Sequence, residues 1–101
     1  MAIVVVGSVA LDSITTAAGT FPNQLGGSAT YFSLAARRAT TVRIVAAVGK
    51  DFPQAQARLL RHPRVDVSGL AVMPGKTFRW AGTYSEDFSS RETTGLWLGV
   101  F

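Results

Sequence analysis

The stretch that decides the fold is Ala2-Ile3-Val4-Val5-Val6-Gly7-Ser8-Val9-Ala10, at the beginning of a chain of 101 residues. It is rich in β-branched residues and does not alternate between apolar and polar, which is typical of a strand buried on both faces of a parallel sheet. Residues 42–48, Val-Arg-Ile-Val-Ala-Ala-Val, form a second run of the same kind. A helical segment between them, from Gly26 to about Arg38, completes a strand–helix–strand unit with a right-handed crossover. The sequence therefore predicts an α/β fold built on a parallel βαβ sheet.

The segment between the first strand and the helix is rich in Thr, Gly, Pro and Asn. This composition predicts a loop over residues 13–25, with room for a short strand at residues 13–16. The helix itself is expected to lie close on the sheet through an apolar stripe with helical spacing and mostly small side chains. The members of that stripe are Phe32, Ala35, Ala36 and Ala39.

A second helix is expected to follow the second strand. Asp51 is the expected N-cap, Pro53 suits the first turn, and the helix runs to about Arg61. A short third strand is expected at residues 70–73.

From residue 76 the apolar period changes to two. Phe78, Trp80 and Tyr84 fall on one side of this segment, which predicts a strand with an aromatic face in a small antiparallel sheet. A turn around residues 86–90 returns the chain to a partner strand at residues 94–100. The aromatic stripe is interpreted as core or interface in preference to a platform on which a sugar stacks. The apolar run at the end of the sequence favours a chain that is cut inside a strand.

Composition limits the class of protein. An apolar content of 48% and a charged content of 16% exclude intrinsic disorder, and 101 residues suit one domain. The absence of cysteine excludes disulfides, cysteine-ligated metals and thiol nucleophiles. The formal charge of +4 is dispersed, and Arg58 and Arg61 are spaced as on one solvated helix face, so no nucleic-acid partner is expected. No secretory signal and no run of roughly 18 apolar residues is present, which predicts a cytoplasmic protein that does not associate with a membrane.

Candidate ligand contacts gather where the predicted parallel strands end. Ligands of open α/β sheets bind beyond the carboxyl ends of the strands, and Asp12, Gly26-Gly27 and Asp51 are all expected there. A carboxylate can accept hydrogen bonds from two neighbouring hydroxyls, and glycines let a ligand approach free N–H groups. The alternatives stay open at this point: Asp12 as an ordinary turn residue, and the glycines as a tight loop entering a helix. For Asp51 the cap is favoured over the contact.

Two other patterns are rejected as sites. Pro74-Gly75-Lys76-Thr77 contains the Gly-Lys-Thr of a phosphate loop, but the upstream spacing is wrong and a β pattern follows where a helix is needed. His62 has no triad partners at readable spacing, so it is interpreted as a surface histidine. No cluster indicates a metal site.

Four motifs, taken together and in order, resemble the N-terminal part of the ribokinase-like sugar and nucleoside kinases. Residues 3–12 resemble the family's opening strand, which ends in Gly-x-x-x-x-Asp, and residues 25–30, Leu-Gly-Gly-Ser-Ala-Thr, resemble its first signature. Residues 45–51 resemble the Val-Gly-x-Asp that follows the second strand. Residues 65–68, Val-Asp-Val-Ser, resemble the Val-Asp-x-Ser before the third.

The resemblance implies that Asp12, Gly26, Gly27 and Ser28 contact the hydroxyls of the substrate. Tyr31 stands where the family's signature helix usually carries Asn, which leaves the substrate's identity open. The family's Gly-Ala-Gly-Asp motif, which supplies the catalytic base and an anion hole for the phosphates, does not occur in the sequence.

The resemblance also implies a single unit over residues 1–101, an N-terminal kinase fragment in which residues 76–100 form lid strands and offer a homodimer contact. ATP and Mg²⁺ are expected only for a full-length parent, with no cofactor and no catalytic residue in this chain. The sequence thus predicts the substrate-binding part of an ATP-dependent sugar or nucleoside kinase, inactive as given. The alternative is a non-catalytic small-molecule-binding or dimerisation module.

Overall fold

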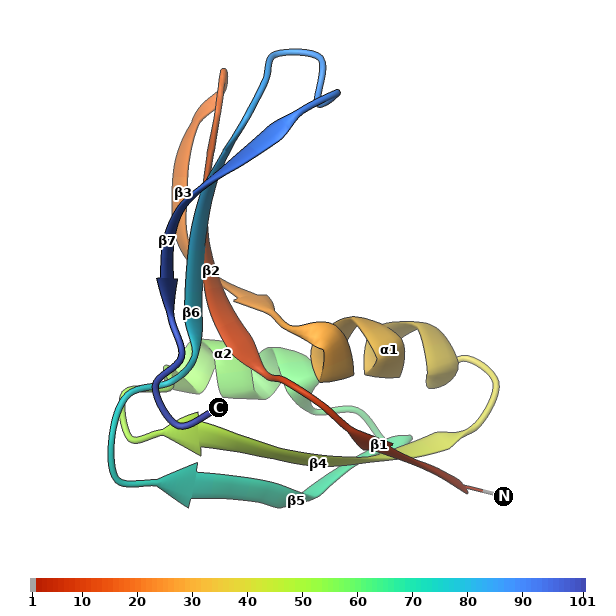
Figure 1. Cartoon of the computed structure of the whole chain (residues 1–101). Coiled ribbons are helices and arrows are strands. Elements are labelled where there is room, and N and C mark those ends of the chain that lie inside the picture. The colour runs from red at the N-terminus through yellow and green to blue at the C-terminus, as the bar shows by residue number, and fades with distance from the viewer. Residues whose placement is uncertain (1) are drawn as a thin grey trace.

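The computed structural model describes residues 2–101, so position 1 of the expected unit lies outside the described residues. Residues 2–101 form two sheets and two helices, and the second sheet projects from the layer made by the first sheet and its helices (Figure 1). The elements are β1 (Ala2–Val6), β2 (Ala10–Thr16), β3 (Gly19–Gly26), α1 (Ser28–Ala36), β4 (Thr41–Gly49), α2 (Gln54–Leu60), β5 (Val65–Met73), β6 (Arg79–Tyr84) and β7 (Arg91–Trp97).

The first sheet is parallel throughout and has the order β1-β4-β5. Both helices lie on the same side of this sheet (Figure 1), and the core forms between the helices and the sheet. The predicted α/β fold with a parallel βαβ sheet is confirmed. The third strand is longer than expected, because it begins at Val65 and not at residue 70. The buried residues that pack together in this core cluster are Val9, Ala29, Ile44, Val48, Leu60 and Val65.

The prediction that the first strand is buried on both faces is wrong. Val4 is 57% exposed and Val6 is 77% exposed. β1 is an edge strand of the sheet, and within residues 2–101 no layer covers the face opposite the helices. Its apolar run therefore has the composition of a doubly covered strand but is covered here on one face only.

The first apolar run also divides into two strands. β1 ends at Val6, and the chain leaves the first sheet through Gly7, Ser8 and Val9 to begin β2 in the second sheet. The predicted loop over residues 13–25 is wrong as well, because this segment continues β2 and returns as β3. Ala17 and Ala18 suffice for the hairpin turn, where the backbone N–H of Ala18 donates to Thr16 Oγ1 at 3.1 Å. The short strand expected at residues 13–16 is part of β2.

The second sheet has four strands in the order β3-β2-β6-β7. Its outer pairs are antiparallel as predicted, but its central pair, β2 with β6, is parallel. This parallel pair exists because the β2–β3 hairpin joins the two strands formed by residues 76–100. We call this four-stranded sheet the lid sheet.

The predicted apolar stripe of α1 is wrong. The residues of α1 that are buried are Ala29, Thr30 and Ser33, whereas Phe32 is 46% exposed. The helix is rotated relative to the expectation because its first turn is held by the segment between β1 and β2. The backbone N–H of Ala29 donates to the carbonyl of Ser8 at 2.9 Å, so Ala29 faces the sheet.

Ser8 and Ser28 hold the two segments together reciprocally. The backbone N–H of Ser28 donates to Ser8 Oγ at 2.9 Å, and the backbone N–H of Ser8 donates to Ser28 Oγ at 3.1 Å. The two hydroxyls share a further hydrogen bond of 3.1 Å. Between the strand and the helix, Gly27 has φ 97° and ψ 157°, a conformation that is essentially restricted to glycine. We call this contact of Ser8 with Gly27, Ser28 and Ala29 the serine crossing.

We predict that Gly27→Ala destabilises the chain more than Gly19→Ala does. Both glycines have positive φ, at 97° and 137°, so both substitutions introduce backbone strain of about 1–3 kcal/mol. A Cβ at Gly27 would in addition overlap the carbonyl of Ser8, whereas nothing lies within 4 Å of a Cβ at Gly19. Thermal or urea unfolding should therefore show a further loss of about 1–3 kcal/mol for Gly27→Ala. Equal losses for the two variants would show that the serine crossing is not tightly packed.

Candidate functional site

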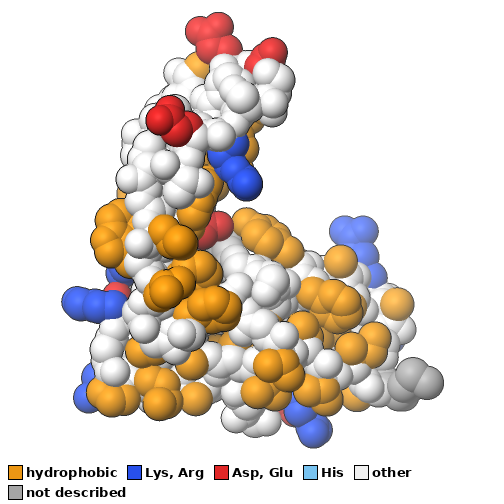
Figure 2. Space-filling model, in the orientation of Figure 1, with side chains coloured by type: hydrophobic (Ala, Val, Ile, Leu, Met, Phe, Trp, Pro, Cys, Tyr) orange, Lys and Arg blue, Asp and Glu red, His pale blue; other side chains and the backbone are white. Residues whose placement is uncertain are grey.

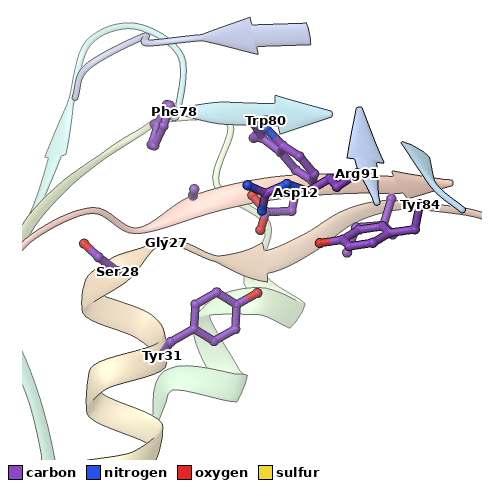
Figure 3. A pocket seen from close by; sticks show the side chains of 10 residues that line it. Asp12, Gly27, Ser28, Tyr31, Phe78, Trp80, Tyr84 and Arg91 are labelled. Atoms are coloured by element: carbon purple, nitrogen blue, oxygen red, sulfur yellow. The ribbon is translucent and has the colours of Figure 1, made fainter. Parts of the chain in front are cut away.

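A cavity of about 290 Å³ lies between the first turn of α1 and the inner face of the lid sheet (Figure 3). Its size is near the lower end of the range of about 300–1,000 Å³ that is usual for small-molecule sites. Hydrophobic side chains spread over the inner side of the lid sheet and over the layer formed by the first sheet and its helices (Figure 2). The residues that line the cavity are Ala10, Asp12, Ile14, Gly27, Ser28, Tyr31, Phe78, Trp80, Tyr84 and Arg91.

Asp12 supplies a carboxylate to this cavity. It does not follow the first strand, as expected, but lies within β2, where it pairs with Gln24 on one side and Trp80 on the other. Within residues 2–101 its side chain has no hydrogen bond and no ion pair, and burial raises the pKa of the Asp12 carboxyl above its ordinary value. A half-buried carboxylate without a donor is costly unless a ligand provides one.

Of the other three predicted contacts, two line the cavity and one does not. Gly27 and Ser28 line the cavity, but the Ser28 hydroxyl is also engaged with Ser8 in the serine crossing. Gly26 does not line the cavity. Any Cβ at Gly26 would overlap the carboxylate of Asp12, so this glycine makes room for that side chain. As substrate contacts, the four residues remain predictions.

The aromatic side chains that the sequence placed on one face of the strand after residue 76 line the cavity. They are Phe78, which directly precedes β6, and Trp80 and Tyr84 of β6. The core or interface role favoured for this stripe stays a prediction. The ring centroids of Trp80 and Tyr84 are 6.5 Å apart in an edge-to-face arrangement. The guanidinium carbon of Arg91 lies 5.4 Å from the centroid of the Trp80 ring.

The site predictions did not include Tyr31 or Arg91. Tyr31 follows Ser28 by three residues, so helical spacing places it beside the cavity in the first turn of α1. Burial, and then the charge of Asp12, raise the pKa of the Tyr31 phenol, which keeps it a neutral hydrogen-bond donor and acceptor. Arg91 pairs with Tyr84 across the β6–β7 hairpin. It lies outside the return strand expected at residues 94–100, because β7 begins at Arg91, so no local signal pointed to it.

Several kinases are similar to this chain. A cytidine kinase of Thermococcus kodakarensis is 33% identical over 88 residues, which cover 86% of this chain and 31% of that protein. A nucleoside kinase of Methanocaldococcus jannaschii, described as an archaeal member of the ribokinase family, superposes with a TM-score of 0.75 at 20% identity over 97% of this chain and 37% of that structure. A ribokinase of Cryptococcus neoformans in complex with ADP gives a TM-score of 0.77 at 20% identity over 97% of this chain and 33% of its own.

The chain has the fold of the N-terminal part of the ribokinase-family kinases. A nucleoside kinase of Burkholderia thailandensis in complex with inosine supports this, with a TM-score of 0.77 at 17% identity over 98% of this chain and 36% of that structure. No protein-family model matches the chain. The chain spans about a third of the length of the relatives that it matches.

In this ribokinase-type fold, Asp51 is neither a cavity residue nor the expected N-cap. α2 is preceded by Pro53, and no side chain caps it. The Asp51 carboxylate instead accepts hydrogen bonds from the backbone N–H of Thr77 at 2.8 Å and from its hydroxyl at 2.7 Å. It also forms an ion pair of 2.8 Å with Arg79, the first residue of β6. Arg79 in turn donates to Asn23 Oδ1 of β3 at 2.6 Å, so we call this group the lid anchor.

The lid anchor explains why the Gly-Lys-Thr sequence is not a phosphate loop. Thr77 is fully buried, and its hydroxyl accepts a hydrogen bond from the backbone N–H of Gly49 at 2.9 Å. As the sequence predicted, the strand β6 follows the Gly-Lys-Thr sequence, where a phosphate loop would need a helix. Among residues 2–101 no three His, Asp or Glu side chains gather as metal ligands. None of the helices that the structure describes is long and apolar enough to cross a membrane.

We predict that Asp51→Asn lowers the free energy of unfolding at pH 7 by about 1.5–3 kcal/mol, because charge-assisted hydrogen bonds are lost. Burial opposes ionisation of Asp51, but hydrogen bonds from Arg79 and Thr77 outweigh it and hold the pKa of this carboxyl well below its ordinary value. A lowered folded-state pKa stabilises the fold fully above roughly pH 5 and progressively less as the pH falls below about 4. The difference between variant and wild type should therefore shrink on acidification.

Asp66→Asn is the matched control for this prediction. Asp66 forms an ion pair of 3.1 Å with Arg43, but this pair is exposed and screened by solvent, so its loss should matter much less. Urea unfolding of the three proteins between pH 3 and pH 7 measures both effects. A loss for Asp51→Asn that is independent of pH would contradict an electrostatic lid anchor.

Proposed function

We propose that this chain forms the acceptor-binding part of an ATP-dependent kinase that phosphorylates a hydroxyl of a sugar or a nucleoside. The observation that carries the proposal is the unpaired carboxylate of Asp12 in the cavity beneath the lid sheet. The similarity to ribokinase-family kinases supports phosphoryl transfer as the reaction class. The cavity supports binding of the acceptor as the task of this chain.

In this proposal Asp12 accepts hydrogen bonds from neighbouring hydroxyls of the acceptor. A carboxylate has two oxygens and about four lone-pair sites, which suits a diol. The Tyr31 phenol lies across the cavity from the Asp12 strand (Figure 3), where it can contact the same molecule from the α1 side. The lid sheet covers the acceptor and excludes water, which strengthens each of these polar contacts.

Phosphoryl transfer needs positioning of the nucleotide, stabilisation of the developing charge and a base for the acceptor hydroxyl. The Gly-Ala-Gly-Asp motif that the family uses for these tasks does not occur in the sequence, so we derive no step through ATP or Mg²⁺. We infer that this chain alone binds the acceptor but does not phosphorylate it, and that nucleotide, metal and base are contributed by further polypeptide.

A second candidate function is dimerisation through the lid sheet. It is favoured by the exposed apolar side chains at the end of the edge strand β7, where Leu96 and Trp97 are each 56% exposed. Edge strands and exposed apolar patches are common places of association. Sedimentation at several concentrations tests this candidate, and a monomer throughout would exclude it.

We predict that Asp12→Asn weakens the binding of D-ribose or cytidine by roughly tenfold to a hundredfold. Asn has a similar shape but lacks the charge and replaces one acceptor with a donor, and a charge-assisted hydrogen bond contributes about 1.5–3 kcal/mol. Calorimetric titration of the 101-residue chain measures the change. Asp66→Asn, which removes a carboxylate far from the cavity residues, should leave binding unchanged. Equal affinities of wild type and Asp12→Asn for both ligands would contradict the proposal.

We also predict that the 101-residue chain with ATP and Mg²⁺ gives no phosphorylated ribose or cytidine above a control without protein. Chromatographic separation of the products tests this prediction. Turnover that Asp12→Asn abolishes would show that the transfer machinery lies within the chain after all.

A further inference from the structure

One feature of the cavity has no role in the binding of hydroxyls, namely the contact of Arg91 with Trp80. The backbone of Arg91 pairs with Tyr84, four residues beyond Trp80 along the lid sheet. Its side chain reaches back, so that the guanidinium carbon lies 5.4 Å from the centroid of the Trp80 ring. Within residues 2–101 Arg91 forms no ion pair and no hydrogen bond through its side chain. Its donors therefore remain available to a ligand.

The Trp80 ring is fixed in place by its neighbours. Its Nε1 donates to Thr93 Oγ1 at 3.2 Å, and Tyr84 packs against it edge to face. A Cβ at Gly82 would overlap the indole, so the ring lies flat along its own strand over this glycine. Trp80 is thus a rigid surface, and Arg91 adds a planar cation to it.

This layer of Arg91 on Trp80 favours one chemical class of ligand over another. Aromatic rings alone do not discriminate, because the C–H face of a sugar and the π face of a heterocycle both pack on them. A guanidinium discriminates, since it stacks on planar bases and donates in its plane to carbonyl and ring-nitrogen acceptors. A saturated sugar ring offers no π face to the cation.

The layer and the proposed hydroxyl site belong to the same wall of the cavity. Asp12 and Trp80 are partners in the register of β2 with β6, and both side chains line the cavity together with Arg91 (Figure 3). A ligand whose hydroxyls reach Asp12 therefore has the Trp80 strand directly beside it. A furanose that carries a planar base satisfies both parts of the wall.

We propose that Arg91 and Trp80, bordered by Tyr84, form a subsite for a planar nitrogen heterocycle, so that the acceptor is a nucleoside and not a free sugar. This inference rests on the proposed function, because it assumes that Asp12 holds the hydroxyls of the same molecule. Arg91 is then a residue that determines specificity, and Asp12 serves every hydroxyl ligand.

Titration of the 101-residue chain with two matched ligands tests the subsite. Cytidine carries the base, and methyl β-D-ribofuranoside has the same furanose without it. We expect cytidine to bind at least tenfold more tightly. Arg91→Ala should weaken cytidine by roughly tenfold and leave the methyl riboside unchanged, since only the base meets the guanidinium. Arg91→Lys keeps the charge but lacks the planar guanidinium, so its affinity for cytidine should lie between those of wild type and Arg91→Ala.

Two controls separate this inference from the proposed function. Asp12→Asn should weaken both ligands, and Arg58→Ala, which removes an exposed arginine of α2, should weaken neither. Equal affinity for the two ligands, or an equal loss of both in Arg91→Ala, would overturn the subsite while leaving the hydroxyl site intact. Failure of wild type to bind either ligand would overturn both. Trp80→Leu, checked for folding by its melting temperature, should repeat the selective loss of cytidine.

Discussion

The arrangement of the molecule depends on the serine crossing. Ser8 lies between the two sheets, and its backbone and side chain hold the first turn of α1 through Ser28 and Ala29. Only a glycine at position 27 lets the helix start this close to the carbonyl of Ser8. The crossing fixes where β2 leaves the first sheet, and therefore where Asp12, four residues further on, enters the cavity. It also fixes the rotation of α1, which places Tyr31 at the same cavity.

The lid sheet has a second attachment, the lid anchor. The serine crossing holds the β2–β3 hairpin from the side of α1, and the ion pair of Asp51 with Arg79 holds β6 from the end of β4. Asn23 of β3 connects the hairpin to β6 and to α2. Its side-chain oxygen accepts a hydrogen bond from Arg79, and its backbone carbonyl accepts one of 2.6 Å from the side-chain amide of Gln56 in α2. The walls of the cavity are thus held from both sides, which is what preorganised binding of a small acceptor requires.

The sequence was a good guide to the elements and a poor one to their burial. Strand, helix and turn signals located α1, β4 and the β6–β7 hairpin, because local periodicity and turn-forming residues determine these elements. The division of the first apolar run at Gly7 and the exposure of Val6 were not predictable, since both depend on which layers are present in space. The resemblance predicted Asp12 as a ligand contact, and Asp12 lines the cavity, whereas Arg91 reaches the cavity only through strand pairing that no local pattern contains.

The carboxyl pKa of Asp12, measured in the presence and absence of ligand, tests whether Asp12 binds the hydroxyls of the acceptor. Burial raises the pKa of the Asp12 carboxyl in the free chain. Hydroxyl donors favour the ionised form, so a bound polyol should lower this pKa. The measurement is a titration of the side-chain ¹³C signal of Asp12 with and without saturating methyl β-D-ribofuranoside. We predict a raised pKa in the free chain that falls when the ligand binds. An Asp12 pKa that does not respond to bound ligand would show that this carboxylate does not contact the hydroxyls.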